Sequence, residues 1–218
     1  MRSIVIENYK TTLSLTQRQE EILIGTILGD GHLEKLYTPE SSRLKVEHSY
    51  KQKDYVDWLY GEFKNWVRTE PKPKIKKVWG KIHKNYGFST YGHRLLGNFQ
   101  KEFYTEKKKI IPADLVNHIT PLVLAVWYMD DGSIKSSKHK GIFLNTQSFN
   151  EEDVKKLQDV LRNMFGITTI TRKVPGGEQI YLGGESGGKF IEIIRPYIIP
   201  SLQYKIPRIL RLTELPKE

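Results

Sequence analysis

The sequence contains no cysteine among its 218 residues, which excludes a disulfide framework, a thiolate metal site and a cysteine nucleophile. No stretch approaches the roughly 18–20 consecutive apolar residues of a membrane span, so we expect no membrane partner. The segment from Met1 to Gln17 lacks the apolar core of a signal peptide. These absences favour an intracellular protein, in a bacterial or archaeal cytoplasm or in an organelle (mitochondrion or chloroplast).

Acidic residues are scarce relative to basic ones. The 25 Asp and Glu residues against 35 Lys and Arg give a formal net charge of +10. Lysines cluster between positions 72 and 81 and in the run 107–109. Clustered positive charge is typical of proteins that bind a polyanion, most often nucleic acid. An ordinary solvated surface and an anionic membrane are the alternatives, and no basic amphipathic helix supports the second.

Two stretches of the chain resemble each other, Leu23–Gly31 (LIGTILGDG) and Leu124–Gly132 (LAVWYMDDG). Each is an apolar, helix-like run that ends at Asp-Gly, and strand and helix patterns follow both in the same order. Offsets of 101, 99 and 96 positions separate Asp30 from Asp131, Ser49 from Ser148, and Lys109 from Lys205. A nearly constant offset indicates a duplicated unit.

Capping signals and hydrophobic periodicity predict the elements of each half. Thr16 with Gln19 forms a capping box, and Thr120 before Pro121 marks the start of the equivalent helix. Hairpins are predicted to pair 32–37 with 42–48, 73–79 with 82–90, 133–136 with 141–147, and 168–174 with 179–183. Further helices are predicted over 54–67, 92–103, 150–165 and 186–195, the third with an apolar face of Val154, Leu157, Leu161 and Met164.

The predicted fold class is therefore α+β (mixed α/β), built from two pseudo-symmetric αββαββα repeats with antiparallel sheets. We expect an N-terminal extension over 1–15, a first repeat over 16–113 and a second repeat over 114–218. The two repeats would form a single pseudo-twofold unit.

Asp30 and Asp131 end their helical runs, where a carboxylate is disfavoured by roughly 0.3–1 kcal/mol because that end carries partial negative charge. A divalent cation such as Mg²⁺ would offset this cost. Gly25 and Gly29 form a small stripe, matched by Ala125, that predicts close packing of the two helices and convergence of the two carboxylates. An Asp-Gly turn after a buried helix is common, but two copies in a basic, duplicated chain favour a metal site.

These paired motifs resemble those of the LAGLIDADG homing endonucleases, in the monomeric form with two motifs in one chain. The second copy keeps the Leu-Ala opening, the first keeps glycine in third place, and both keep the Asp-Gly close. Residues 127–132 (WYMDDG), 144–149 (LNTQSF) and 196–200 (PYIIP) are similar to the yeast mitochondrial intron endonuclease type within this family. The resemblance covers nearly the whole chain, from about residue 15 to about residue 212.

The resemblance implies that the sheets form a saddle for double-stranded DNA, with the motif helices packed at the centre. Asp30 and Asp131 would share two or three Mg²⁺ ions at the scissile phosphates, each aspartate serving one strand. Phosphodiester hydrolysis across the minor groove would leave 3′ overhangs at a long asymmetric target and promote intron mobility.

Other site residues also follow from the resemblance. Lys109 and Lys205 would lie near the metal waters and stabilise developing negative charge or help deprotonate the attacking water. Gln147 and, in the first repeat, His48 would order that water. His48 departs from the family's usual glutamine and also fits a structural histidine.

Period-two alternation selects outward strand positions as candidate DNA contacts, basic ones for phosphate or guanine and glutamine for adenine. Each of these side chains also fits an ordinary exposed strand position. The selected residues are Arg43, Lys45, Lys74, Lys76, Thr171, Lys173, Gln179 and Tyr181.

Three other functions remain open. A group I intron maturase on the same fold would bind intron RNA and assist splicing. A non-cleaving DNA-binding regulator would be expected to have lost one of the motif aspartates, and both are present. A different aspartate-dependent phosphohydrolase is disfavoured, because those folds place the aspartate after a strand.

Overall fold

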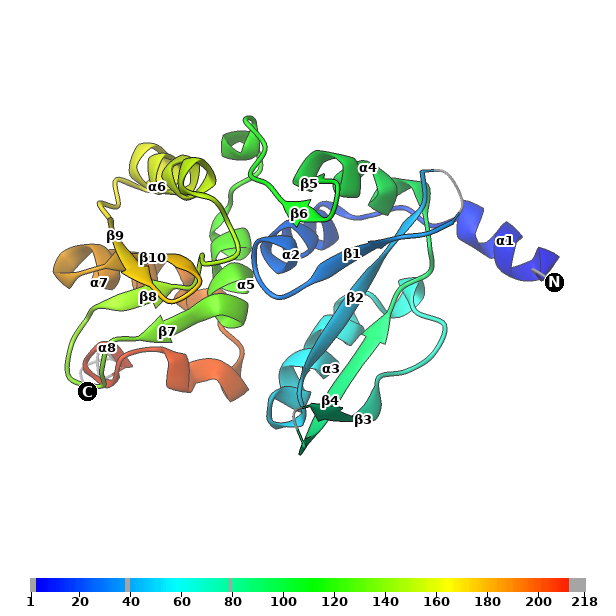
Figure 1. Cartoon of the computed structure of the whole chain (residues 1–218), viewed down its shortest axis with the longest axis horizontal. Coiled ribbons are helices and arrows are strands. Elements are labelled where there is room, and N and C mark those ends of the chain that lie inside the picture. Colours follow the sequence, from blue (N-terminus) through cyan, green and yellow to red (C-terminus); the bar gives the residue numbers. More distant parts are fainter. Residues whose placement is uncertain (1–2, 38–39, 79, 212–218) are drawn as a thin grey trace, which may run out of the picture. The chain divides into compact units, whose positions relative to one another are not determined.

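The computed structural model describes residues 3–37, 40–78 and 80–211. Its elements follow the predicted αββαββα order twice (Figure 1). The first repeat comprises α2 (Gln17–Leu28), β1 (His32–Lys35), β2 (Ser42–Ser49), α3 (Lys53–Glu62), β3 (Lys72–Val78), β4 (Lys81–Ser89) and α4 (Arg94–Phe103). The second comprises α5 (Pro121–Asp131), β7 (Gly132–Ile134), β8 (Ile142–Leu144), α6 (Glu151–Phe165), β9 (Ile170–Val174), β10 (Gly177–Leu182) and α7 (Gly184–Ile194). The predicted fold class is confirmed.

Shorter elements include α1 (Ile4–Thr11), the small hairpin of β5 (Tyr104–Thr105) and β6 (Lys108–Lys109), the 3₁₀ turn η5 (Pro200–Lys205) and α8 (Arg208–Arg211). Contacts divide the chain into a first unit, Met1–Leu23 with Asp30–Glu102, and a second, Ile24–Gly29 with Phe103–Glu218. The last turns of α2 thus belong to the second unit. No helix in the described ranges is long and apolar enough to cross a membrane.

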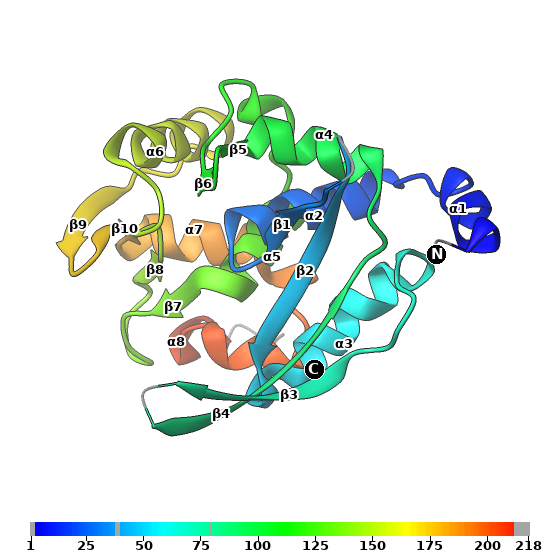
Figure 2. The same ribbon diagram turned by 45° about the vertical axis from the view of Figure 1, so that its right-hand side comes forward.

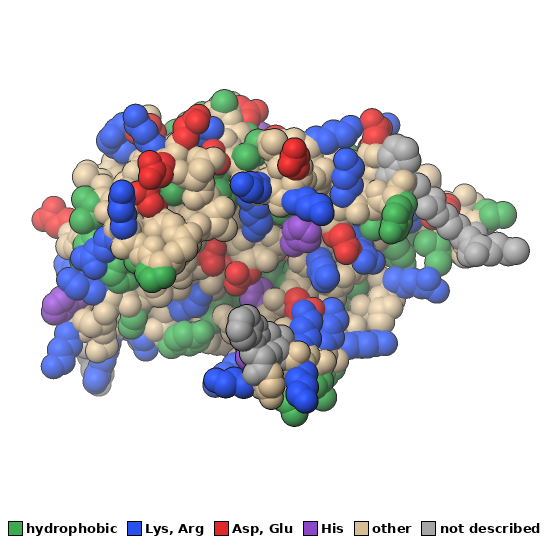
Figure 3. Space-filling view, viewed as in Figure 1, with side chains coloured by type: hydrophobic (Ala, Val, Ile, Leu, Met, Phe, Trp, Pro, Cys, Tyr) green, Lys and Arg blue, Asp and Glu red, His purple; other side chains and the backbone are tan. Residues whose placement is uncertain are grey.

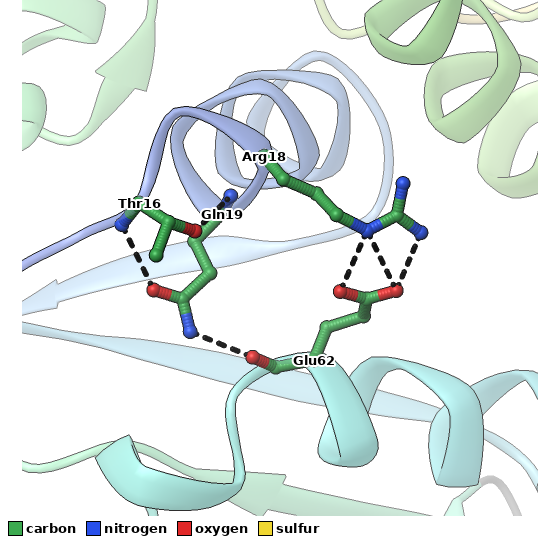
Figure 4. A network of polar contacts seen from close by, with 4 residues as sticks. All are labelled: Thr16, Arg18, Gln19 and Glu62. Carbon is green, nitrogen blue, oxygen red and sulfur yellow. Dashed lines mark hydrogen bonds and ion pairs between the residues drawn. The ribbon is translucent and has the colours of Figure 1, made fainter.

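The predicted capping box determines where α2 begins. The Thr16 hydroxyl accepts the backbone N–H of Gln19 at 3.2 Å, and the Gln19 side-chain oxygen accepts the N–H of Thr16 at 3.1 Å (Figure 4). Gln19 also donates to the backbone carbonyl of Glu62, and Arg18 forms a forked ion pair with the Glu62 carboxylate. The box thereby ties the start of α2 to the end of α3.

The sheet of the first unit has the antiparallel order β1-β2-β4-β3. In β2, Leu44, Val46 and His48 are buried, whereas Arg43, Lys45 and Glu47 are half-exposed. Helix α3 packs against β2 and β4 and covers the buried face (Figure 2). The alternation therefore gives this sheet one core face and one outer face that carries charged side chains.

The sheet of the second unit repeats the order, β7-β8-β10-β9. Helix α6 packs against β10, begins at the Asn150 cap and ends at Gly166, whose φ of 58° suits the left-handed helix end. Val154, Leu157 and Leu161 are buried as predicted, but Met164 is 48% exposed and the prediction that it belongs to the apolar face is wrong. Met164 lies in the last turn of α6, beyond the part that the core covers.

Within the second unit, the end of α2 packs closely on α5. A Cβ atom on Gly25 would lie 2.6 Å from Val126 Cβ and 2.7 Å from the Val123 carbonyl oxygen, too close for any side chain. The predicted close approach at Gly25 is confirmed. The prediction that Ala125 is its small partner is wrong, because a larger residue, Val126, fills the space that glycine leaves.

Candidate active site

Asp30 directly follows the last turn of α2 and belongs to the first unit. Its side chain is 54% exposed, so its carboxylate is accessible to a ligand. His48 on β2 is buried, with Nδ1 3.7 Å from Asp30 Oδ2 and its ring edge-to-face on Tyr55 at 5.3 Å. The structure therefore brings two predicted site residues, Asp30 and His48, together.

Lys109 binds the end of α2. It ends the β5–β6 hairpin, in which it pairs with Tyr104. Its Nζ donates to the backbone carbonyl of Gly29 at 2.5 Å, and Gly29 immediately precedes Asp30 in the chain. A cation on the terminal carbonyls of a helix neutralises the negative end of its dipole. Lys109 therefore offsets part of the cost of a carboxylate at this helix end.

Lys205 makes the equivalent contact on α5. From η5, its Nζ donates to the backbone carbonyls of Met129, at 2.5 Å, and Asp130, at 2.9 Å, just before Asp131. The Lys205 carbonyl accepts the Tyr128 hydroxyl at 2.7 Å, and burial raises the pKa of that phenol. Lys205 is thus held to the last turn of α5 through both its side chain and its backbone.

The two lysine contacts occupy equivalent places in the two repeats, although the helix ends themselves differ. Position 29 is glycine where the equivalent position 130 is aspartate, and a Cβ on Gly29 would collide with the Asp130 side chain. Asp130 is only 6% exposed, whereas Asp131 is half-exposed. Of the two carboxylates at this helix end, Asp131 is thus the more accessible, and its role as a metal ligand stays a prediction.

The outer face of the first sheet is basic but partly neutralised. Arg43 forms an ion pair with Glu34, and the Glu47 carboxylate contacts both Lys74, at 3.0 Å, and Lys76. Figure 3 shows Lys and Arg side chains gathered around the β3–β4 hairpin. The outward placement of Arg43, Lys45, Lys74 and Lys76 is confirmed, and their contact with DNA stays a prediction.

Glu47 is a residue of this face that the sequence analysis missed. Partial burial raises the pKa of the Glu47 carboxyl, but hydrogen bonds from Lys76, Asn85 and Lys74 outweigh it and lower the pKa to about 2. The carboxylate is therefore ionised at neutral pH and holds two lysines in place. The available signal was the alternation along β2, which places Glu47 on the same face as Arg43 and Lys45.

The register of the second sheet corrects the predicted orientation of two candidate DNA contacts. Thr171 pairs with the buried Ile180, so it faces the helix-covered side, where its hydroxyl donates to Gln158 of α6 at 3.3 Å. Lys173, two residues on, shares that side. The prediction that these two residues face outward is wrong, because β9 is an edge strand whose Ile170 is 56% exposed on the opposite side.

The outer face of the second sheet carries the predicted Gln179 and Tyr181, with Arg172 beside them. The Gln179 amide donates to the Asn145 side-chain oxygen at 2.6 Å, and Arg172 pairs directly with Gln179 across the strands. Arg172 is a residue that the sequence analysis missed. The sequence analysis assumed that Ile170 and Val174 point inward, and this assumption placed Arg172 on the inward side with them.

Strand register also corrects the predicted equivalence of His48 and Gln147. His32 and Ser133, each two residues after its motif aspartate, pair with Lys45 and Phe143, so Lys45 and Phe143 are equivalent. His48 lies three residues after Lys45, and Thr146 lies three residues after Phe143. His48 is therefore equivalent to Thr146, which is also buried, and not to Gln147. Gln147 lies in the turn after β8, and its role in ordering water stays a prediction.

Comparison with known proteins places this geometry in a family. Residues 20–190 match the LAGLIDADG DNA endonuclease family. The chain is 34% identical over 213 residues to the probable intron-encoded endonuclease 1 of Wickerhamomyces canadensis, covering 94% of this chain and 90% of that protein. It is 34% identical over 199 residues to the cytochrome b mRNA maturase bI2 of Saccharomyces cerevisiae, covering 85% of this chain but 46% of the maturase.

A solved structure agrees with these relatives. The homing endonuclease I-WcaI bound to its DNA recognition sequence superposes with a TM-score of 0.88 at 32% sequence identity, covering 94% of this chain and 92% of that one. Together with the motif helices and their paired lysines, these matches show that the chain belongs to the LAGLIDADG DNA endonuclease family.

Proposed function

We propose that this homing endonuclease hydrolyses one phosphodiester bond in each strand of a long asymmetric DNA target. Asp30 and Asp131 would each bind divalent metal, with Mg²⁺ as the physiological ion. The product would carry 3′ overhangs, and the break would promote mobility of an intron. Both repeats lie in one chain, so a monomer would act on double-stranded DNA. We expect it inside the cell, in a prokaryotic cytoplasm or an organelle.

One observation carries the proposal. Each motif helix ends at an accessible aspartate, and a lysine from the equivalent position of the repeat binds the carbonyl just before that aspartate. Both copies of the duplicated unit keep the carboxylate and the lysine, although the two helix ends differ at Gly29 and Asp130. Stability would be served better by a neutral cap.

The residues present fit a divalent ion. The side chains of Asp30 and Asp131 are both about half-exposed. The backbone N–H of Asn145 donates to the Asp131 carbonyl at 3.1 Å, which fixes the backbone at this position. Hard cations prefer such carboxylate oxygens together with phosphate oxygens and water. A bound ion would activate water and stabilise the leaving 3′-oxygen.

The lysines would act beside these carboxylates. Lys109 and Lys205 hold the terminal carbonyls, which positions Asp30 and Asp131 and adds positive charge near the scissile phosphates. His48 would act from the first repeat, close to Asp30. The outer sheet faces would carry the DNA, since strand ribbons fit the major groove.

The experiment is a cleavage selection on a plasmid library of random duplexes, with Mg²⁺ or with Ca²⁺ in its place. We expect wild type to cut one long asymmetric sequence and leave 3′ overhangs. Asp30→Asn and Asp131→Asn should each lose double-strand cutting by roughly 10³-fold or more while still binding the site in Ca²⁺. Cutting at the wild-type rate by both variants would overturn the proposed roles of these aspartates.

A second function is favoured by one specific finding, the similarity to maturases. The bI2 maturase of Saccharomyces cerevisiae, and that of Debaryomyces hansenii at 30% identity, match over most of this chain. If the folded protein cuts no duplex, we propose that it binds its host intron RNA and assists splicing. Salt-dependent binding to that RNA, together with faster splicing in vitro, would establish this alternative.

A further inference from the structure

Aromatic side chains form a platform on the outer face of the second sheet. The rings of Phe143 on β8 and Tyr181 on β10, paired directly across the strands, lie 4.9 Å apart at an angle of 37°. Two glycines make room for the tyrosine ring, since a Cβ on Gly141 would lie 2.6 Å from its hydroxyl oxygen and one on Gly183 would lie 3.0 Å from the ring. The backbone is thus shaped to hold Tyr181 in one place.

Arg172 lies over this platform. Its guanidinium carbon is 4.3 Å from the centre of the Tyr181 ring and 5.2 Å from the centre of the Phe143 ring. Cation–π contacts of this kind hold the arginine stem while leaving the N–H groups at its edge available. Among the ion pairs of the described residues, none involves Arg172, whereas Arg43 on the first sheet is paired with Glu34.

We propose that Arg172 determines specificity by reading a guanine in the major groove of the target half contacted by the second sheet. Phe143 and Tyr181 act as positioning residues that hold its guanidinium. The inference rests on the proposed DNA cleavage and names one residue that selects the site. Arginine is suited to guanine because it can donate two hydrogen bonds to O6 and N7 at once.

A fixed guanidinium favours base reading over a simple phosphate contact. A phosphate contact tolerates a mobile side chain, as lysine does, whereas bidentate recognition of a base edge needs a defined position. Lys135, whose Nζ lies 5.6 Å from the Tyr181 ring centre, flanks the same platform and is placed to contact phosphate. The platform therefore holds Arg172 in a position to contact a base and has Lys135 beside it to contact phosphate.

The test uses the wild-type site from the selection and every single base-pair substitution of it, with binding measured in Ca²⁺. Arg172→Lys keeps the positive charge but removes the two parallel N–H donors of the guanidinium. We expect a preference for guanine of roughly 10- to 100-fold at one or two adjacent pairs to fall close to one, with all other preferences unchanged. Lys173→Arg is the matched control, because it changes the next residue on the helix-covered side and should alter nothing.

The possible outcomes separate the claims. Uniform weakening across all substitutions by Arg172→Lys would show a phosphate contact and overturn the guanine assignment, as would an unchanged profile. If wild type yields no cleavage site at all, the proposed endonuclease function has failed, and not this inference alone.

The platform is tested with Tyr181→Phe and Tyr181→Leu. The first keeps the ring and should keep the guanine preference, whereas the second removes the ring and should reduce the same preference, by less than Arg172→Lys does. Melting temperatures of both variants check that the sheet is intact. Equal preferences in Tyr181→Leu and wild type would overturn the positioning role.

Discussion

The two sheets have the same strand order, but the charged side chains on their outer faces have different partners. On the first sheet, glutamates neutralise the basic residues, with Glu34 on Arg43 and Glu47 on Lys74 and Lys76. On the second, the position equivalent to Glu47 is Asn145, which accepts from Gln179. The neighbouring Arg172 rests on aromatic rings. A repeated backbone has therefore been given one charge-paired and one aromatic surface.

This difference bears on the kind of target that the enzyme reads. Lysines that reach phosphates would contribute affinity that depends on salt, whereas a positioned arginine would contribute base selection. We therefore expect sequence selectivity to be stronger in the target half contacted by the second sheet. An asymmetric site follows from two unequal faces in one chain.

The motif helices differ in a complementary way, and this gives the largest predicted effect. Positions 25 and 126 are equivalent in the two repeats and meet each other, glycine against valine. Gly25→Val would place two valines where one fits, and we expect it to destabilise the protein by about 3 kcal/mol. Urea unfolding checks this value.

The exchange variant sharpens this prediction. Gly25→Val combined with Val126→Gly keeps one valine and one glycine at the contact, and should recover most of the lost stability. Gly61→Val in α3 controls for the general effect of adding valine to a helix, because among the described residues no atom outside its chain neighbours and its own helix backbone lies within 4 Å of the added Cβ. If the exchange variant is no more stable than Gly25→Val, the two positions are not complementary.

Local signals in the sequence predicted the frame of the fold correctly. The Thr16–Gln19 box and the Thr120 cap act within one helical turn, so the residues concerned are read together in the sequence. The duplication then predicted the order of the remaining elements and the equivalence of Lys109 and Lys205. The sequence thereby identified the two helix ends and related the two lysines to each other, but it did not predict that these lysines bind the helix-end carbonyls.

Features that depend on neighbouring strands could not be predicted in the same way. The sequence analysis assigned the β9 residues to the wrong faces of the sheet, because it assumed that Ile170 points inward. In this edge strand Ile170 is exposed, so apolar character does not mark the inward side. The roles of Glu47 and Arg172 depend on which side chains lie across the sheet. That information comes from register, which a single sequence specifies only through its hydrophobic pattern.

Glu47 gives the next largest expected effect, in the first sheet. Its carboxyl pKa is lowered from 4.5 to about 2, so its ion pairs contribute stability above about pH 4.5 that is lost as the pH falls toward 2. After allowance for solvent screening, we expect Glu47→Gln to cost about 2 kcal/mol at neutral pH. Unfolding free energies of wild type and variant should converge as the pH is lowered.

The pH dependence distinguishes this mechanism from a packing effect. A difference between wild type and Glu47→Gln that is constant from neutral pH down to about pH 3 would contradict it. The same variant frees Lys74 and Lys76 from their partner. DNA binding should therefore depend more steeply on salt, with a steeper slope by about one to two ions if both lysines reach phosphates.

Asn145→Glu transfers the acidic residue of the first sheet to the second, and its expected effect is the smallest. The new carboxylate would lie beside Gln179 and draw Arg172 away from the DNA, weakening binding in Ca²⁺ by about 1 kcal/mol, or roughly fivefold. Asn145→Gln, which keeps the charge and the hydrogen-bonding groups, should bind within about twofold of wild type. Because Arg172 would be neutralised and not removed, the guanine preference should fall together with the affinity. If affinity falls while every base preference stays intact, the new carboxylate acts only by repelling the DNA phosphates. That result would contradict the idea that the guanine preference of the second sheet depends on Arg172 having no acidic partner.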